Sequence, residues 1–122
     1  MKLIYLATPY STPDLRLRNI RYEQACLACR KLLKDTSHIN IYCPIVHWHP
    51  IAQSFTALQN TDEAWAARNK DILRISDELC VLRLRGWRES PGVKAEIAFA
   101  EQEQKPIWYL DETFVEAANG ND

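Results

Sequence analysis

The sequence predicts one α/β domain with a mainly parallel sheet of four to five strands and helices on both faces. Short β-rich apolar runs alternate with helical patterns along the whole chain, which is typical of parallel strands joined by right-handed crossovers. The 122 residues are enough for one domain with an ordinary core but too few for two.

A strand and a long helix open the chain. The run KLIYLA at 2–7 is short, apolar and rich in residues that favour strands. The following helix is expected from Pro13 to Lys34, because Ser11 or Thr12 can cap it and Pro13 suits its first turn.

The middle of the chain gives a less regular pattern. The run INIYCPI at 39–45 is the second strand, and Pro44 is expected to end it. Residues 46–62 are expected to form a loop with one short helix. Thr61 or Asp62 then begins the next helix.

The last third repeats the alternation. A third strand is expected at 78–84, a helix at 91–104 and a fourth strand at 105–110. The remaining residues are expected to begin as a short helix and to end disordered. We therefore divide the chain into a domain at 1–112 and a tail at 113–122.

The cysteines of the first helix lie on an apolar stripe. Leu15, Tyr22, Cys26, Cys29 and Leu33 are spaced as one face of a helix, and cysteine packs as a small apolar residue. Only one CxxC pair is present, so core packing is favoured over metal binding or redox chemistry. The other two cysteines are Cys43 and Cys80.

Composition excludes several classes of partner. The apolar content of 47% and charged content of 25% are those of a soluble globular protein. A formal net charge of −1 gives no electrostatic case for a nucleic-acid polymer or an acidic membrane. No apolar run is long enough to cross a bilayer, and the first residues do not resemble a signal peptide, so a cytoplasmic location is expected. GxGxxG and Walker sequences are absent, which argues against dinucleotide binding and NTP hydrolysis.

Polar and aromatic residues gather where the predicted strands end. These segments are ATPYS after the first strand, PIVHWH after the second and RGWRESPG after the third. Open parallel sheets bind ligands beyond the carboxyl ends of their strands. The composition of these segments suits a small-molecule pocket.

The third of these segments ends in a strong helix start. Ser90 can cap the helix with its hydroxyl, and Pro91 lacks an N–H and suits the first turn. Gly92 carries no side chain, so a ligand can approach the backbone. The free N–H groups favour an anion or a hydroxyl there, although an ordinary cap explains Ser90 equally well.

Glu96 lies beside the buried stripe of the same helix. Val93, Ile97 and Ala100 form that stripe, and Glu96 is their neighbour at helical spacing. Helical side chains lean toward the N-terminus, so the carboxylate points toward the strand ends. It could serve as nucleophile or base, but a partly buried surface glutamate would give the same pattern.

Three segments resemble one family, the nucleoside 2-deoxyribosyltransferase superfamily with its deoxynucleotide N-hydrolase relatives. They are IYLATPYS, PIVHWHPI and SDELCVLRLRGWRESPGVKAEIAFAEQEQKPIWYL, in that order along the chain. The closest likeness is to a small bacterial and phage branch of that superfamily. The resemblance implies a flavodoxin-like or Rossmann-like domain, a nucleoside or nucleotide ligand and a homo-oligomer, either a dimer or a tetramer.

The resemblance also implies roles for single residues. Glu96 matches the nucleophile that attacks the sugar C1′, and Tyr5 matches the tyrosine that orients it. Ser90 matches the position that holds a 5′-hydroxyl or 5′-phosphate, and Gly92 the glycine of close approach. The implied chemistry is that of a retaining glycosidase, which needs no metal or other cofactor.

One position departs from the family pattern. The family has an aspartate eight residues before Asp77, where this chain has Asn69. An amide can hydrogen-bond a base but cannot transfer a proton to it. Asp71 cannot replace the aspartate, because two residues turn a helix by about 200°.

Four further residues are candidates for lining the pocket. His47 and His49 alternate, so they would share one side of an extended segment, and metal binding is disfavoured because a third ligand is lacking. Trp87 could stack on a base or ribose, or serve as an ordinary interface or lid aromatic. Tyr10 borders the first loop and could contact a base or phosphate.

We therefore expect a nucleoside- or nucleotide-binding protein that cleaves or exchanges the N-glycosidic bond through Glu96. Two alternatives stay open. One is a non-catalytic nucleotide-binding or sensing module, which Asn69 favours. The other is a protein-interaction module on the same fold, in which Glu96 has a structural role.

Overall fold

Four parallel strands form one sheet in the computed structural model, which describes residues 1–54 and 62–119. The strand order is β2-β1-β3-β4 and every neighbouring pair is parallel, which confirms the predicted α/β fold of flavodoxin-like or Rossmann-like type. The strands are β1 (Lys2–Ala7), β2 (Ile39–Tyr42), β3 (Glu78–Arg83) and β4 (Ile107–Asp111). The helices are α1 (Leu15–Asp35), α2 (Pro44–Ser54), α3 (Asp62–Ile75), α4 (Pro91–Gln102) and α5 (Glu112–Asn119).

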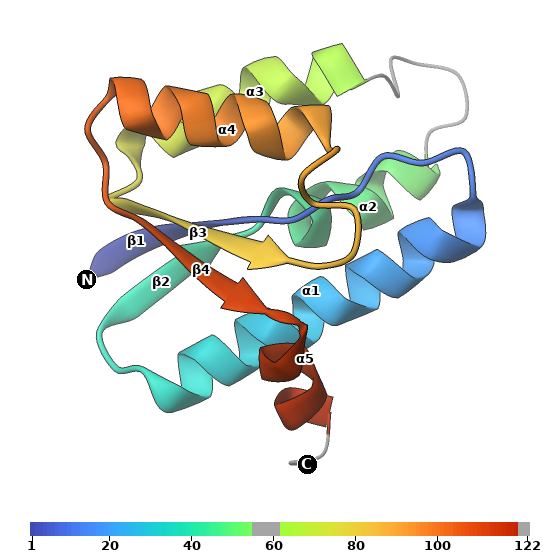
Figure 1. Cartoon of the computed structure of the whole chain (residues 1–122), viewed down its shortest axis with the longest axis horizontal. Helices are drawn as coiled ribbons and strands as arrows, with labels where there is room; N and C mark the ends of the chain where they lie inside the picture. The colour runs from blue at the N-terminus through green and yellow to red at the C-terminus, as the bar shows by residue number, and fades with distance from the viewer. Residues whose placement is uncertain (55–61, 120–122) are drawn as a thin grey trace.

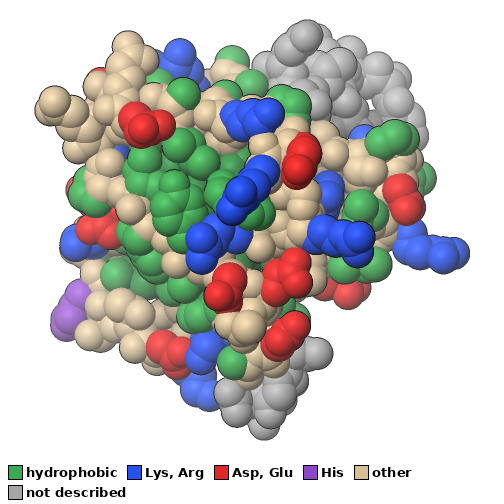
Figure 2. All heavy atoms as spheres, viewed as in Figure 1, with side chains coloured by type: hydrophobic (Ala, Val, Ile, Leu, Met, Phe, Trp, Pro, Cys, Tyr) green, Lys and Arg blue, Asp and Glu red, His purple; other side chains and the backbone are tan. Residues whose placement is uncertain are grey.

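The sheet has a buried core on each face. Ile4 and Leu6 of β1 pack with residues of α1 and α5, whereas Tyr5 and Ala7 pack with residues of α3 and α4. Figure 1 shows these two helix pairs on opposite sides of the sheet. Some hydrophobic side chains still reach the surface between α4 and β4 (Figure 2). Burial on both faces explains why the central strands read as continuous apolar runs.

The chain leaves two adjacent strands toward opposite faces. β1 and β3 are neighbours, yet α1 follows β1 on one face and α4 follows β3 on the other. In open parallel sheets, ligands bind beyond the carboxyl ends of the strands at such a point. The topology therefore directs attention to the segments after β1 and β3.

Helix α1 begins later than predicted. Asp14 caps it, because its Oδ1 accepts from the amides two and three residues further on, at 3.0 and 3.4 Å. The caps predicted at Ser11 or Thr12 and the helix start at Pro13 are therefore wrong. An aspartate carboxylate directly before the first free amides satisfies them as well as a serine or threonine would.

The predicted apolar stripe of α1 is wrong at both ends. Leu15 and Leu33 are 68% and 53% exposed, whereas Ala25, Ala28 and Leu32 face the core. Small alanine side chains let the helix pack closely against the sheet, and the spacing of large apolar residues does not indicate this. All four cysteines are free thiols, and three of them pack in or against this core.

The segment after β2 begins with a helix. β2 ends at Tyr42, and Pro44 is the first residue of α2. The strand predicted to residue 45 is therefore too long. The helix predicted within residues 46–62 is present but begins at Pro44, because proline fits the first turn of a helix as well as it ends a strand. Residues 55–61 of that predicted segment lie outside the described residues.

The predicted short helix at the chain end is confirmed as α5. Val115 and Ala118 are buried, and α5 packs against α1. The Arg30 guanidinium on α1 donates a hydrogen bond to the carbonyl of Ala118 at 3.3 Å. Residues 120–122 lie outside the described residues.

Arg21 of α1 joins the segments that follow β1 and β3. Its guanidinium donates to the carbonyls of Tyr10, Ser11 and Arg85, at 3.3, 3.5 and 3.3 Å. Glycine at position 86 leaves room for the Arg21 guanidinium, because a Cβ there would lie only 3.0 Å from Arg21 Nη2. The φ of Gly86 is 91°, which also favours glycine. The two segments at the carboxyl edge are thus held by one side chain.

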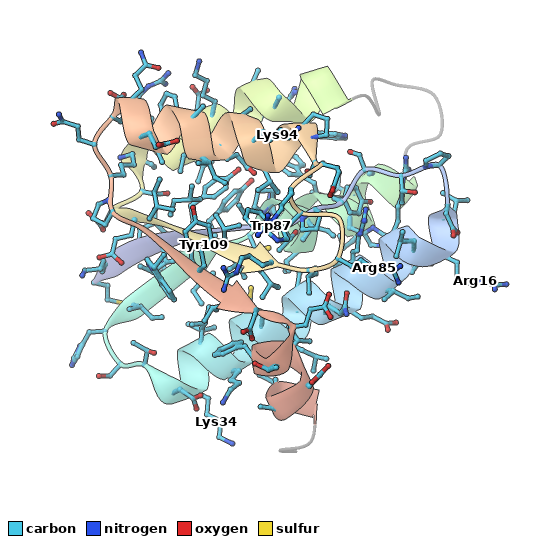
Figure 3. All side chains as sticks on the ribbon, viewed as in Figure 1. Arg16, Lys34, Arg85, Trp87, Lys94 and Tyr109 are labelled. Atoms are coloured by element: carbon cyan, nitrogen blue, oxygen red, sulfur yellow. The ribbon has the colours of Figure 1, made fainter. Side chains whose placement is uncertain are left out.

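We predict that Arg21→Ala lowers the free energy of unfolding by about 1 to 2 kcal/mol, because three carbonyls lose a charged donor. Equilibrium unfolding in urea measures this change. Arg16→Ala is the control, since that side chain points away from the molecule (Figure 3), and it should stay within about 0.5 kcal/mol of the parent. An equal loss in both variants would contradict the role given to Arg21.

Candidate functional site at the carboxyl edge of the sheet

A tyrosine on β1 and a glutamate on α4 meet beneath the start of α4. The Tyr5 hydroxyl donates a hydrogen bond to Glu96 Oε2, and the two residues are 91 positions apart in the sequence. Tyr5 is fully buried, and Val93 and Ala100 fix α4 over the same core. β1 and α4 are therefore joined by a direct hydrogen bond between two side chains.

Burial sets the protonation of both groups. Loss of water raises the pKa of Glu96 to about 7, and the hydrogen bond from Tyr5 opposes this rise. Burial, and then the charge of Glu96, raise the pKa of Tyr5 far above its ordinary value. Tyr5 therefore keeps its proton and donates it in the hydrogen bond. A carboxylate with one donor and little solvation suits a nucleophile or a base.

Tyr42 extends the pair toward α3. It is the strand partner of Tyr5, and the two ring centroids are 5.6 Å apart. Burial raises the pKa of Tyr42 to about 12, and its hydroxyl donates to Asn69 Oδ1 at 3.1 Å. Trp48 of α2 donates to the same oxygen from Nε1 at 2.9 Å. Asn69 is thus connected to Glu96 through two tyrosines whose rings are in contact and tilted by 47°.

Aromatic rings surround Asn69. The Trp48 ring lies 4.8 Å from that of Trp65 and 4.5 Å from that of His47, measured between centroids. Trp65 and Asn69 are one helical turn apart on α3 and so share a face. Flat apolar rings beside an amide can recognise a planar ligand through both stacking and hydrogen bonding.

The sequence analysis did not identify Tyr42 or Trp48 as site residues. Tyr42 was considered only as a residue of the second strand. That it lies next to Tyr5 follows only from the pairing of β1 with β2. Trp48 lay in the segment predicted as a loop, where no direction could be assigned to its ring. The available signal was the concentration of aromatic residues after the second predicted strand.

The start of α4 agrees with the prediction. Ser90 is the N-cap, and its Oγ accepts from the amide of Val93 at 3.3 Å. Gly92 is exposed, and a Cβ added there would meet only Ser90 Oγ, at 3.9 Å. No side chain therefore covers the backbone at Gly92 in the first turn of α4. This helix begins at Pro91, five residues before Glu96.

His49 belongs to a different network, on the α1 side. It is buried, its Nδ1 lies 2.7 Å from the Tyr10 hydroxyl, and its Nε2 lies 3.0 Å from Asn19 Oδ1. Its ring also stacks on Tyr22, with centroids 4.3 Å apart. Burial lowers the pKa of His49, which favours the neutral ring. The described contacts of Tyr10 and His49 hold α2 against α1 and do not reach the Tyr5–Glu96 pair.

His47 and His49 do not share one side. Both lie on α2, where two residues correspond to a rotation of about 200°, so the expectation for an extended segment is wrong. His47 is exposed beside Tyr42 and Trp48. Within residues 1–54 and 62–119, no three His, Cys, Asp or Glu side chains could hold a metal ion together.

Trp87 faces β4. The centroid of its ring lies 5.9 Å from that of the Tyr109 ring (Figure 3). The Arg88 guanidinium lies 5.3 Å from the centroid of the Trp87 ring. Its described ring contacts therefore leave it apart from the cluster around Asn69. On α3, Asp71 is exposed and paired with Arg74 at 2.9 Å, as expected of a residue that points away from the direction of Asn69.

We predict a pH-dependent stability that originates at Glu96. An unfolded glutamate ionises near 4.5 and the folded one near 7, so the unfolded chain releases its proton first. The free energy of unfolding should fall by about 1 to 3 kcal/mol as the pH rises between these values, and then level off. Urea titrations at pH 5, 6, 7 and 8 measure this.

Glu96→Gln should remove this fall, because glutamine does not titrate. The exposed Glu101→Gln should retain it. The same pH dependence in Glu96→Gln as in the parent protein would contradict the assignment.

The comparisons place the chain in a family. Residues 2–112 match the model of a family described as a domain of unknown function (DUF1937). Among the curated proteins that were compared, none matches the chain. None of the helices in the described part of the chain is long and apolar enough to cross a membrane. Since the match runs from β1 to the first residue of α5, the chain belongs to the DUF1937 family.

Proposed function

We propose that this protein binds a nucleoside or nucleotide and cleaves or exchanges its N-glycosidic bond, with Glu96 as the nucleophile. The observation that carries the proposal is the hydrogen bond from buried Tyr5 to Glu96, next to the open first turn of α4. A desolvated carboxylate that a single donor holds in place is the group that glycosyl transfer needs.

The proposed reaction has two steps. A Glu96 oxygen forms a bond to the sugar C1′ while the N-glycosidic bond breaks, and the electron pair of the broken bond leaves with the base, which takes up a proton from solvent. Water, or a second base, then attacks C1′, gives up a proton to solvent and releases the carboxylate. Tyr5 holds Glu96 by one oxygen and leaves the other for the sugar. Glu96 must be ionised to attack, so the reaction should proceed faster above its pKa of about 7.

The first turn of α4 would bind the 5′ end of the sugar. Ser90 provides a hydroxyl, Gly92 leaves the backbone open, and free amides with the positive end of the helix dipole favour a hydroxyl or phosphate. The groups that contact the 5′ end and the Glu96 carboxylate that attacks C1′ would all belong to the same helix, α4. The distance between the 5′ group and C1′ would then be set by α4.

A second candidate is a binding module that does not turn its ligand over. Asn69 favours it, because an amide can hydrogen-bond the departing base but cannot transfer a proton to it. Binding through the aromatic rings and the start of α4 would be unaffected. Catalysis and binding alone thus predict different outcomes for the same ligands.

We predict that the protein releases or exchanges base from 2′-deoxynucleosides or their 5′-monophosphates, and that Glu96→Gln lowers kcat/KM at least about 100-fold. Chromatographic detection of free base, with and without an added acceptor base, measures this. Glu101→Gln is the matched control on the exposed side of α4 and should keep full activity.

The other outcomes separate the two candidates. Absence of turnover together with a rise of the melting temperature by nucleotides would support the binding module. If no nucleoside or nucleotide is turned over or shifts the melting temperature, both candidates are wrong.

We predict that Tyr5→Phe moves the pH profile of kcat/KM. The Tyr5 hydrogen bond lowers the pKa of Glu96, so its loss should shift the midpoint of the rise in activity to a pH above that of the parent. The maximal rate should fall about tenfold, since the carboxylate loses its orienting donor. Tyr109→Phe, an exposed tyrosine on β4, should leave the profile unchanged. A lower rate with an unmoved midpoint would contradict the role given to Tyr5.

A further inference from the structure

The orientation of the Asn69 amide is fixed by its neighbours. Its Oδ1 accepts from Trp48 Nε1 at 2.9 Å and from the Tyr42 hydroxyl at 3.1 Å. A tyrosine hydroxyl could donate or accept, but an indole N–H can only donate. Trp48 therefore requires an oxygen at this position, and the amide nitrogen of Asn69 must occupy the other side.

The two N–H groups of Asn69 are available to a ligand. Among residues 1–54 and 62–119, no acceptor binds its Nδ2. All fully buried side-chain nitrogen and oxygen atoms of the described residues have partners, so Nδ2, which has none among them, is not fully buried. The chain thus presents a pair of donors, and no acceptor, at this point.

The aromatic rings beside these two N–H donors favour a planar ligand whose edge faces the Asn69 amide. Trp48 and Trp65 lie beside Asn69 with their rings 4.8 Å apart, and Tyr42 connects it to the Tyr5–Glu96 pair. A planar heterocycle can stack on such rings while a carbonyl on its edge accepts from the amide. A ring that carries an amino group there would bring two donors together, which disfavours binding.

We propose that Asn69 selects for nucleobases with a carbonyl at the edge that faces it, against bases with an amino group at the same place. This selection rests on the proposed function, because it takes the ligand to be a nucleoside or nucleotide. It goes beyond that function in naming the class of base. Trp48 acts as the positioning residue, since its N–H determines which end of the Asn69 amide meets the ligand.

Matched ligand pairs test the selection. The 5′-monophosphates of 2′-deoxyuridine and 2′-deoxycytidine differ by a carbonyl or an amino group and by the proton on the adjacent ring nitrogen. Those of 2′-deoxyinosine and 2′-deoxyadenosine differ in the same two ways. We use the full chain with Glu96→Gln, which prevents turnover, and measure affinities by calorimetry. The carbonyl member of at least one pair should bind about fivefold or more tightly, the effect of one hydrogen bond.

Three variants in the same background identify the cause. Asn69→Asp presents an acceptor where the amide presented donors, so the preference should reverse in favour of the amino member. Trp48→Phe frees the amide to turn, because Tyr42 can also accept, and the ratio of affinities should fall toward one. Ala67→Asp adds the same charge at an exposed site on α3 and should leave the ratio unchanged.

The outcomes separate the selection from the proposed function. The selection would be overturned, with nucleotide binding left intact, if both members of each pair bind equally or the amino members bind more tightly. An unchanged ratio of affinities in both Asn69→Asp and Trp48→Phe would have the same consequence. If Asn69→Asp does not fold, the ratio in Trp48→Phe decides. Absence of binding by all four nucleotides would overturn the selection and the proposed function together.

Discussion

A carboxylate that loses its water needs a hydrogen-bond donor, and the phenol of Tyr5 is that donor for Glu96. The requirement constrains the whole α4 side of the sheet. Tyr5 must stay on the face of β1 that meets α4, and a slip of one residue in the strand would turn it to the opposite face. Helix α4 must in turn keep its register over β1 and β3, which Val93 and Ala100 achieve by their burial.

The same face of the sheet extends this pair into a longer polar chain. Tyr42 stands beside Tyr5 in the next strand, and its hydroxyl meets Asn69, which Trp48 also holds. β1, β2, α2, α3 and α4 all contribute to this chain. Every buried polar side-chain atom of the described residues has a partner, so the cluster is compatible with a stable core. The Nδ2 group of Asn69 has no hydrogen-bond partner among the described residues, and the proposed selection of the base rests on it.

The opposite side of the carboxyl edge has a structural character. His49 is held by Tyr10 and Asn19 and lies on Tyr22, and Arg21 ties the segments after β1 and β3. These residues are polar and close to the strand ends, which are the properties that suggested a pocket. Their hydrogen bonds are nevertheless used within the protein, so residue type near a strand end does not distinguish ligand binding from support.

The sequence by itself determined the features that depend on neighbours along the chain. The alternation of strands and helices, the Ser90 cap and the apolar stripe of α4 were predicted correctly, although of its three residues Val93 and Ala100 are buried and Ile97 is only partly buried. Only the tertiary structure decided that Tyr42 lies beside Tyr5 and that the amide of Asn69 is oriented by α2, because strand pairing and helix packing join residues that are distant in sequence. It also decided between equivalent local signals, since a proline fits both the end of β2 and the start of α2.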